Sequence, residues 1–235
     1  MNTNIIAAGQ TADTGCRVIL WDESEGFSFY PNKKFIARNL SLSELQKDVK
    51  TFVIHHAANW TAKQTYVGLL GRGLSVNFII DDDCNEDGCA TIYQCLDIKD
   101  AGYSHKPLNQ AGPGVEIAVQ PAAWQNPNFY SDENIKKYHV SPHEVQEDVV
   151  HGTKLKCFGP TEAQHKSLTN LLLGFFKLFP NIPKSFPKDD SNNYIKTTIH
   201  QPESYTGILN HYNITNEKVD CLGLDIAKIE FSLLL

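Results

Sequence analysis

The sequence lacks any apolar run long enough to cross a membrane. A spanning helix needs about 20 mainly apolar residues, whereas the longest apolar run here, residues 171–176, is far shorter. An excess of basic residues is also lacking, because 21 lysines and arginines face 27 aspartates and glutamates, for a net charge of −6. Proteins that bind nucleic acid normally present a basic face, so the composition argues against nucleic acid as the main partner.

Closely repeated cysteine spacing is absent as well. Six cysteines in a chain of 235 residues do not dictate a disulfide scaffold. Cys84 and Cys89 could close a small loop in an oxidising compartment, and free thiols in a reducing cell fit equally well. The amino terminus has no basic side chain and only a short apolar stretch at residues 5–8, so we expect no secretory signal. The sequence therefore leaves the localisation open.

The chain does contain an alternation of strand-like and helix-like segments. Two of the helices begin at capping boxes, Thr61–Gln64 and Thr161–Gln164. The order predicts a central mixed β-sheet flanked by helices, which is typical of α/β or α+β proteins, and we expect the α/β (mixed) class. We expect an N-terminal arm and extension over residues 1–40, of which 1–16 are loose, and one domain over 41–235 with an inserted excursion near 125–156. The predicted strands are 17–21, 51–56, 76–81, 91–96 and 114–120, and the predicted helices are 41–47, 61–70 and 161–179.

Two histidine-bearing segments lie about 155 residues apart. An apolar strand ends in His55 and His56, which point to opposite faces if the strand continues, so that only one can face a given site. The second segment ends in His211 and is followed by Asp220 and Cys221. Two imidazoles and a carboxylate or thiolate make the three protein ligands that a catalytic zinc needs beside an open position. The alternatives are a structural histidine pair and an ordinary polar loop.

Other side chains could serve such a site. Glu116 is a carboxylate inside an apolar strand, where burial would raise its pKa and suit it to act as a general base, unless it faces solvent at an edge. Lys218 could stabilise an oxyanion. His105 and His200 could line the same cleft or lie at the surface. Asp83, Asn85 and Asp87 begin like a calcium loop, but Gln94 stands where the bidentate glutamate belongs, so we expect a solvated acidic hairpin there.

Five segments in order, residues 52–56, 74–80, 91–94, 114–117 and 211–220, resemble the zinc-dependent N-acetylmuramoyl-L-alanine amidases. This type 2 amidase family is related to the peptidoglycan recognition proteins and to phage amidase lysins. The resemblance covers about residues 50–225 and implies a type 2 amidase-like fold. The first 40 residues and the 125–156 excursion have no counterpart in it.

The resemblance also implies the ligands of the metal. Zinc (Zn²⁺) would be held by His55, His211 and Asp220. Lys218-Val219-Asp220 is similar to the Lys-x-Asp or Lys-x-Cys ending of the family, which favours Asp220 over Cys221 as the third ligand. Lys218 matches the lysine that stabilises the oxyanion.

Glu116 falls where the branch of muropeptide-recycling amidases carries its catalytic glutamate. One departure is Val76, which occupies the place of a tyrosine that is catalytic in the recognition-protein and phage branches. Glu116 and Lys218 must therefore carry the chemistry of an active enzyme. The expected substrate-binding residues are His56, Asn77, His105 and His200.

The expected function is hydrolysis of the amide bond between N-acetylmuramic acid and the L-alanine of the stem peptide, with peptidoglycan or a muropeptide as the partner. The alternative is a recognition module that binds peptidoglycan without cutting it. A zinc peptidase on another fold is disfavoured because no His-Glu-x-x-His segment is present. The site of action would be periplasmic or extracellular, or cytoplasmic for a recycling enzyme.

Overall fold

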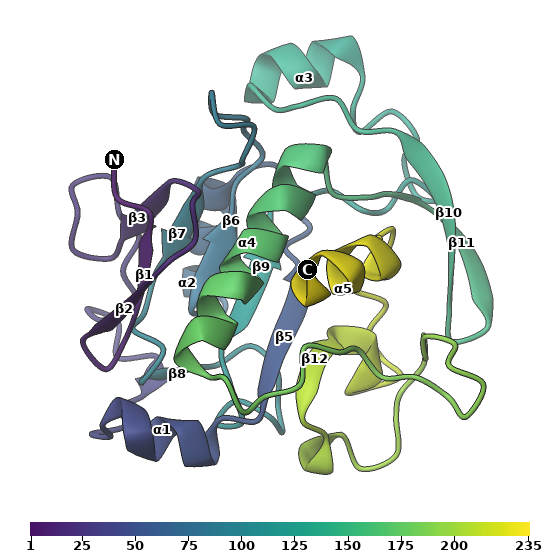
Figure 1. Cartoon of the computed structure of the whole chain (residues 1–235). Helices are drawn as coiled ribbons and strands as arrows, with labels where there is room; N and C mark the ends of the chain where they lie inside the picture. Colours follow the sequence, from purple (N-terminus) through teal and green to yellow (C-terminus); the bar gives the residue numbers. More distant parts are fainter.

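The computed structural model of residues 1–235 contains a six-stranded mixed β-sheet and five α-helices (Figure 1). Four neighbouring strands are parallel, β7 runs antiparallel to β6, and β3 is parallel to β7 at the edge. This arrangement confirms the predicted mixed α/β class. In spatial order the strands are β12 (Gly207–Asn210), β5 (Thr51–His56), β9 (Gly114–Ile117), β6 (Phe78–Ile80), β7 (Ile92–Gln94) and β3 (Val18–Leu20).

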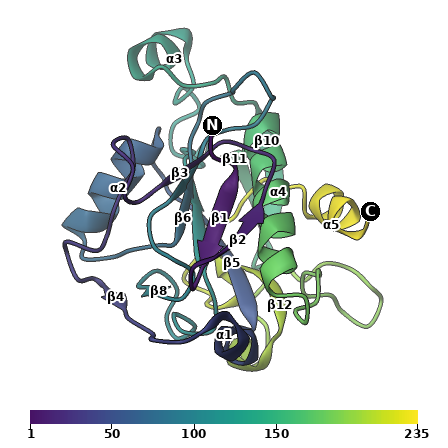
Figure 2. The same cartoon turned by 60° about the vertical axis from the view of Figure 1, so that its left-hand side comes forward.

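Helices cover both faces of this sheet. α4 and α5 pack on one face and α2 lies on the other, as the turned view in Figure 2 shows. None of the helices combines the length and the apolar character that crossing a membrane requires. The helices are α1 (Leu42–Asp48), α2 (Ala62–Gly71), α3 (Asp132–Tyr138), α4 (Glu162–Leu178) and α5 (Ile226–Leu234).

Smaller elements surround the sheet. Two hairpins and one short strand pair lie outside it, and 3-10 turns flank β12. The predicted excursion contains α3 and one of these hairpins. The elements are β1 (Asn4–Ala7) with β2 (Gln10–Asp13), β10 (Val145–Val150) with β11 (Thr153–Phe158), β4 (Phe35–Ile36) with β8 (Ala101–Gly102), η1 (Pro202–Ser204) and η2 (His211–Asn213).

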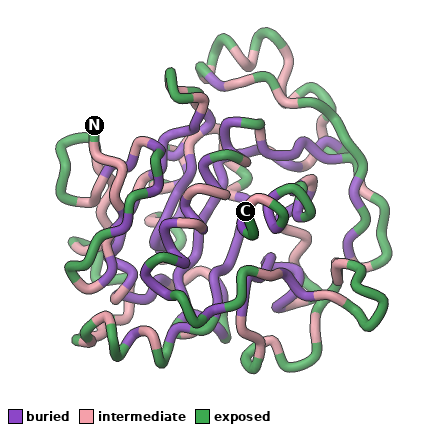
Figure 3. The backbone as a smooth tube through the Cα atoms, in the orientation of Figure 1, coloured by how far each residue is buried: buried purple, intermediate pink, exposed green.

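Helix α4 fixes one face of the sheet. Its capping box is present as predicted, with Thr161 and Gln164 bonded reciprocally at the first turn. Gln164 is fully buried and also donates to the carbonyl oxygens of Asp81 and Ala118, at the ends of two strands. Phe175 packs edge-on against Phe52 of β5. Figure 3 shows the result, a buried sheet and helix surrounded by exposed loops.

Side-chain alternation gives the sheet two different faces. In β5, Phe52 and Ile54 join the large core under α4, so His55 points to the opposite face. In β9, Val115 and Ile117 join the same core, and Glu116 points away from it. His55 and Glu116 are directly paired in the parallel register. Both side chains therefore stand next to each other on the face away from α4.

The acidic segment between β6 and β7 closes a hairpin, as expected. The carboxylate of Asp83 accepts hydrogen bonds from the backbone and the hydroxyl of Thr91, both at 2.6 Å. Asp87 accepts from the backbone of Cys89 at 2.8 Å. Both carboxylates therefore bond within their own hairpin.

The first 16 residues are not the loose arm that the sequence suggested. β1 and β2 form a hairpin whose fully buried Ile5 packs on α4, where a Cβ at Gly174 would lie 3.3 Å from Ile5 Cδ1. A disulfide joins Cys16 to Cys89, rather than Cys84 to Cys89. In a strand of four residues, the alternation of apolar and polar side chains is too short to distinguish the strand from a loose arm. The burial of β1 also depends on α4, which lies more than 150 residues away in sequence.

Two neighbouring substitutions test this packing. Ile5→Ala should lower the free energy of unfolding by about 3 kcal/mol, because it leaves a cavity against α4. Ile6→Ala, on the half-buried side of the same strand, should cost about 1 kcal/mol or less. Urea denaturation of both variants measures the difference. Equal small losses would mean that the hairpin does not pack on the core.

Candidate metal centre

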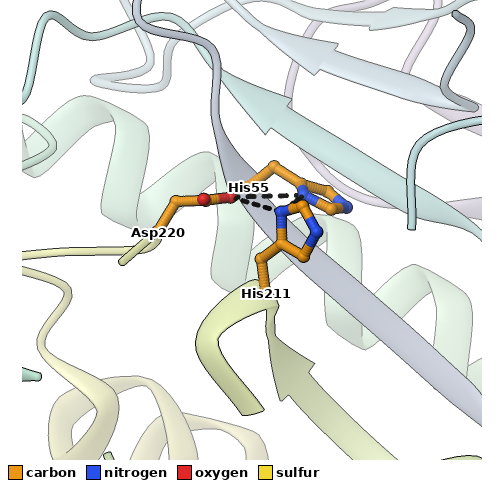
Figure 4. A group of neighbouring side chains, drawn as sticks. All are labelled: His55, His211 and Asp220. Atoms are coloured by element: carbon orange, nitrogen blue, oxygen red, sulfur yellow. Dashed lines mark hydrogen bonds and ion pairs between the residues drawn. The ribbon is translucent and has the colours of Figure 1, made fainter. Parts of the chain in front are cut away.

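Three buried or half-buried side chains converge at one edge of the sheet (Figure 4). His55 ends β5, His211 directly follows the neighbouring strand β12, and Asp220 lies in the loop before α5. The Nδ1 atoms of His55 and His211 are 3.0 Å apart. Oδ2 of Asp220 lies 3.3 Å from Nδ1 of His55 and 3.0 Å from Nδ1 of His211. The sheet thus brings together His55 and His211, which are 156 positions apart in sequence.

The spacing of these atoms fits a metal ion. In a tetrahedral zinc site with bonds of about 2.0–2.1 Å to nitrogen and oxygen, neighbouring ligand atoms lie about 3.3 Å apart. Three electron-rich atoms at 3.0–3.3 Å repel one another unless a proton or a cation lies among them. The group could therefore bind a metal ion.

Protonation favours the ligand forms of these residues. Burial lowers the pKa of His55 to about 4, so the ring is neutral at neutral pH. Burial alone would raise the pKa of Asp220, but hydrogen bonding to His211, together with the close contact with His55, outweighs burial and holds that pKa well below its usual value. A neutral imidazole and an ionised carboxylate are the states that coordinate a metal.

His105 fixes the orientation of His55 from behind. Its Nε2 faces the carbonyl of Gly112 at 3.3 Å and donates to it, so its Nδ1 carries the lone pair that accepts from Ser104 Oγ at 2.7 Å, and Nε2 of His55 lies 3.4 Å from the same Nδ1. A proton on Nε2 of His55 would face this nitrogen and would leave Nδ1, which faces His211 and Asp220, free for a metal. A Cβ at Gly114 would lie 3.0 Å from His105 Cε1, so glycine allows the ring to lie this close.

The structure brings Asp220, and not Cys221, to the two histidines. Cys221 is buried without a disulfide partner. Burial and the neighbouring charge of Asp220 raise the pKa of its thiol well above the usual value, so the thiol stays protonated. A protonated thiol is a poor metal ligand, which agrees with the choice of Asp220.

A cavity of about 680 Å³ opens onto the three residues. Glu116 lines it with 8 % of its surface exposed, and its Oε2 is buried without a hydrogen-bond partner. Burial and the charge of Asp220 raise the pKa of Glu116 well above its usual value, against the opposing charges of Arg72 and Lys218. Further lining residues are His55, His56, Asn59, Thr65, Tyr103, Ser104, His105, Lys106, His211 and Glu217.

The expected substrate-binding residues divide into two pairs. His56 and His105 line the cavity, and neither ring nitrogen of His56 has a partner. Asn77 is fully buried elsewhere and donates to the carbonyl oxygens of Asp97 and Asp100. His200 is exposed on the loop before β12 and does not line the cavity.

Several cavity residues escaped the sequence reasoning. Arg72, Tyr103 and Lys106 lie in loops at the ends of short elements and reach the cavity only because the chain folds back there. The signal for Arg72 was weak, a cation between two glycines that was interpreted only as a helix end. Nothing in the local pattern distinguishes Tyr103 or Lys106 from surface residues.

No protein-family model matches the chain, and a search of curated proteins finds no match either.

Metal binding depends on Asp220 if the cluster is a metal site. The wild-type protein should bind Zn²⁺ and gain thermal stability that a chelator removes, because a ligand bound to the folded state stabilises it. Asp220→Asn should weaken Zn²⁺ binding at least about 100-fold, the upper end of the loss caused by outer-shell changes. Isothermal titration measures both affinities. Asp190→Asn, on an exposed loop, is the matched control, and equal affinities of the two variants would contradict the assignment.

The buried carboxyl of Glu116 makes stability depend on pH. Because its pKa is raised in the folded state, its contribution is full below the usual glutamate pKa and is lost as pH rises through the folded value. Glu116→Gln cannot ionise, so the free energy of unfolding of the metal-free variant should exceed that of wild type at pH 8. The difference should shrink towards pH 4. Urea denaturation across this range measures it, with the exposed Glu203→Gln as control; a difference that does not change with pH would contradict it.

Proposed function

We propose that this protein is a zinc-dependent amidase that hydrolyses the amide between N-acetylmuramic acid and the L-alanine of the peptidoglycan stem peptide. The observation that carries the proposal is the triangle of His55, His211 and Asp220 at the floor of a cavity that also holds Glu116 and Lys218. The order of the five segments that resemble the type 2 amidases supports the same reaction and a type 2 amidase-like fold.

Zinc is the metal that this donor set fits best. Two imidazole nitrogens and one carboxylate oxygen are the kind and number of protein ligands that a catalytic zinc site uses, so His55, His211 and Asp220 would hold the ion. When bound, zinc would supply a Lewis acid that polarises the amide carbonyl and acidifies water.

Glu116 is the proton carrier of the proposed reaction. It lies on β9 beside His55 of β5 and faces the cavity. Its unpaired Oε2 and its raised pKa suit a group that accepts a proton from the attacking water and passes it to the leaving amine. The amide C–N bond then breaks to give a carboxylic acid and the free amino group of L-alanine.

Lys218 is the electrostatic partner. It lines the cavity two residues before Asp220 and forms no ion pair with a protein carboxylate. Its ammonium group is therefore free to stabilise the oxygen on which negative charge develops. Arg72 and Lys106 add two more cations to the cavity lining, which suits a stem peptide that carries carboxylates.

A second candidate function is a module that binds peptidoglycan without cutting it. Val76, fully buried in the place of the family's catalytic tyrosine, is the observation in its favour. An uncompensated buried carboxyl such as that of Glu116 destabilises the fold. A module that only binds has no catalytic use for this carboxyl, so Glu116 counts against this second function.

Mass spectrometry of purified peptidoglycan after incubation with the zinc-loaded protein tests the proposal. We expect stem peptides that begin with L-alanine, no release with a chelator, and a rate about 10²–10⁴-fold lower for Glu116→Gln because the proton carrier is lost. The Glu203→Gln variant should match wild type. Glycan and peptide that stay joined although zinc is bound would favour the binding module.

A further inference from the structure

The β10–β11 hairpin contacts the loop that carries Lys218 and Asp220. It belongs to the 125–156 excursion and its continuation, where the resemblance to the amidases offers no counterpart. Figure 1 shows it as a long ribbon along one side of the molecule, separate from the sheet. Its outer residues are exposed, and it contributes little to the core under α4. Val150 and Cys157 of the hairpin instead pack with Tyr212 and with Leu222 of the loop in a small apolar cluster of their own.

Three hydrogen bonds join the hairpin to this loop on both sides of Asp220. Nε2 of His151, at the hairpin turn, donates to the carbonyl oxygen of Lys218 at 2.9 Å. The carboxylate of Asp148 accepts from the backbone N–H of Gly223 at 2.9 Å, and the amide of Gln146 donates to the carbonyl of Gly223 at 3.2 Å. The backbone is thus held two residues before Asp220 and three residues after it.

The two central side chains are themselves held in place. Asp148 is buried and forms an ion pair of 2.6 Å with Lys196, which makes it a charge-assisted partner for Gly223. The ring of His151 stands edge-on to that of Tyr212, and the N–H of Tyr212 donates to the carbonyl of Asp220 at 3.0 Å. The hairpin, Tyr212 and the Asp220 loop therefore form one connected unit.

The loop has little internal structure to hold Asp220. Residues 214–225 contain no helix or strand between η2 and α5, so their conformation depends on contacts with other segments. We propose that the β10–β11 hairpin is a brace that positions Asp220 and Lys218, with His151 and Asp148 as its positioning residues. This inference rests on the proposed metal site, and it assigns a role in that site to a segment outside the cavity.

One substitution separates the brace from a merely structural role. His151 and Gly152 form the hairpin turn with φ of 52° and 72°, a conformation for which Asn-Gly is the preferred sequence. His151→Asn therefore keeps or improves the turn, but the shorter side chain cannot reach the carbonyl of Lys218. If His151 serves only to form the turn, His151→Asn should leave both the stability and the metal binding unchanged. The brace predicts weaker metal binding without loss of stability.

The experiment compares His151→Asn with wild type in two measurements. Titration should show Zn²⁺ affinity lower by about 10-fold, the lower end of the range for supporting residues. Hydrogen–deuterium exchange of the metal-free proteins should show faster exchange across residues 215–223, with the melting temperature unchanged. The matched control is His139→Asn, because His139 is exposed, has φ of 54° and lies at the end of α3. Asp148→Ala should act in the same direction, and Asp148→Asn should restore part of the loss because its amide oxygen can still accept from Gly223.

Each outcome decides between the proposals. If the exchange of residues 215–223 and the Zn²⁺ affinity of His151→Asn equal those of His139→Asn, the brace is overturned. If wild type binds no Zn²⁺, the proposed function fails, and unchanged loop exchange in His151→Asn would overturn the brace as well. Faster exchange with unchanged affinity would show that the hairpin holds the loop but does not position a ligand, which also overturns the inference.

Discussion

Strand β5 hydrogen-bonds in parallel register to β12 on one side and to β9 on the other. Parallel strands end at the same edge of a sheet, so this pairing sets His55 beside Glu116 and brings His211, which follows β12, to the same place. The apolar side chains that alternate with His55 and Glu116 are buried under α4. A slip of one residue in β5 would therefore expose the core and remove His55 from the candidate site at once.

The candidate site destabilises the folded protein, and this loss of folding free energy indicates a function. Glu116 is buried with an unpaired oxygen, His56 has no partner for either ring nitrogen, and the atoms of the ligand triangle repel one another without a cation or a proton. Ordinary surface packing does not explain such a concentration of uncompensated polar groups. A bound metal would offset part of this cost, which is the physical link between the cluster and the amidase proposed for it.

Sequence reasoning predicted those elements whose signals are local. The apolar run of β5 was sufficient to predict that strand, and the capping box of α4 was sufficient to predict the start of that helix. The acidic hairpin was distinguished from a calcium loop because Gln94 cannot replace a bidentate glutamate. The β1–β2 hairpin was missed, since four residues carry too little alternation to reveal a partner distant in sequence. Helix α5 was also missed, although its apolar residues recur at helical spacing.

The sequence by itself determined the mixed α/β class and the chemical types at the candidate site, because strand periodicity and ligand identity are properties of single residues and their neighbours. The tertiary structure agreed with Asp220 over Cys221, which the Lys-x-Asp ending already favoured. Only the tertiary structure decided that His105 lies against His55, and that Asn77 and His200 lie away from the cavity. It also decided that His151 bonds to the carbonyl of Lys218 in the loop that carries Asp220. These contacts join segments tens of residues apart, and their geometry arises from how the loops pack, which no local pattern encodes.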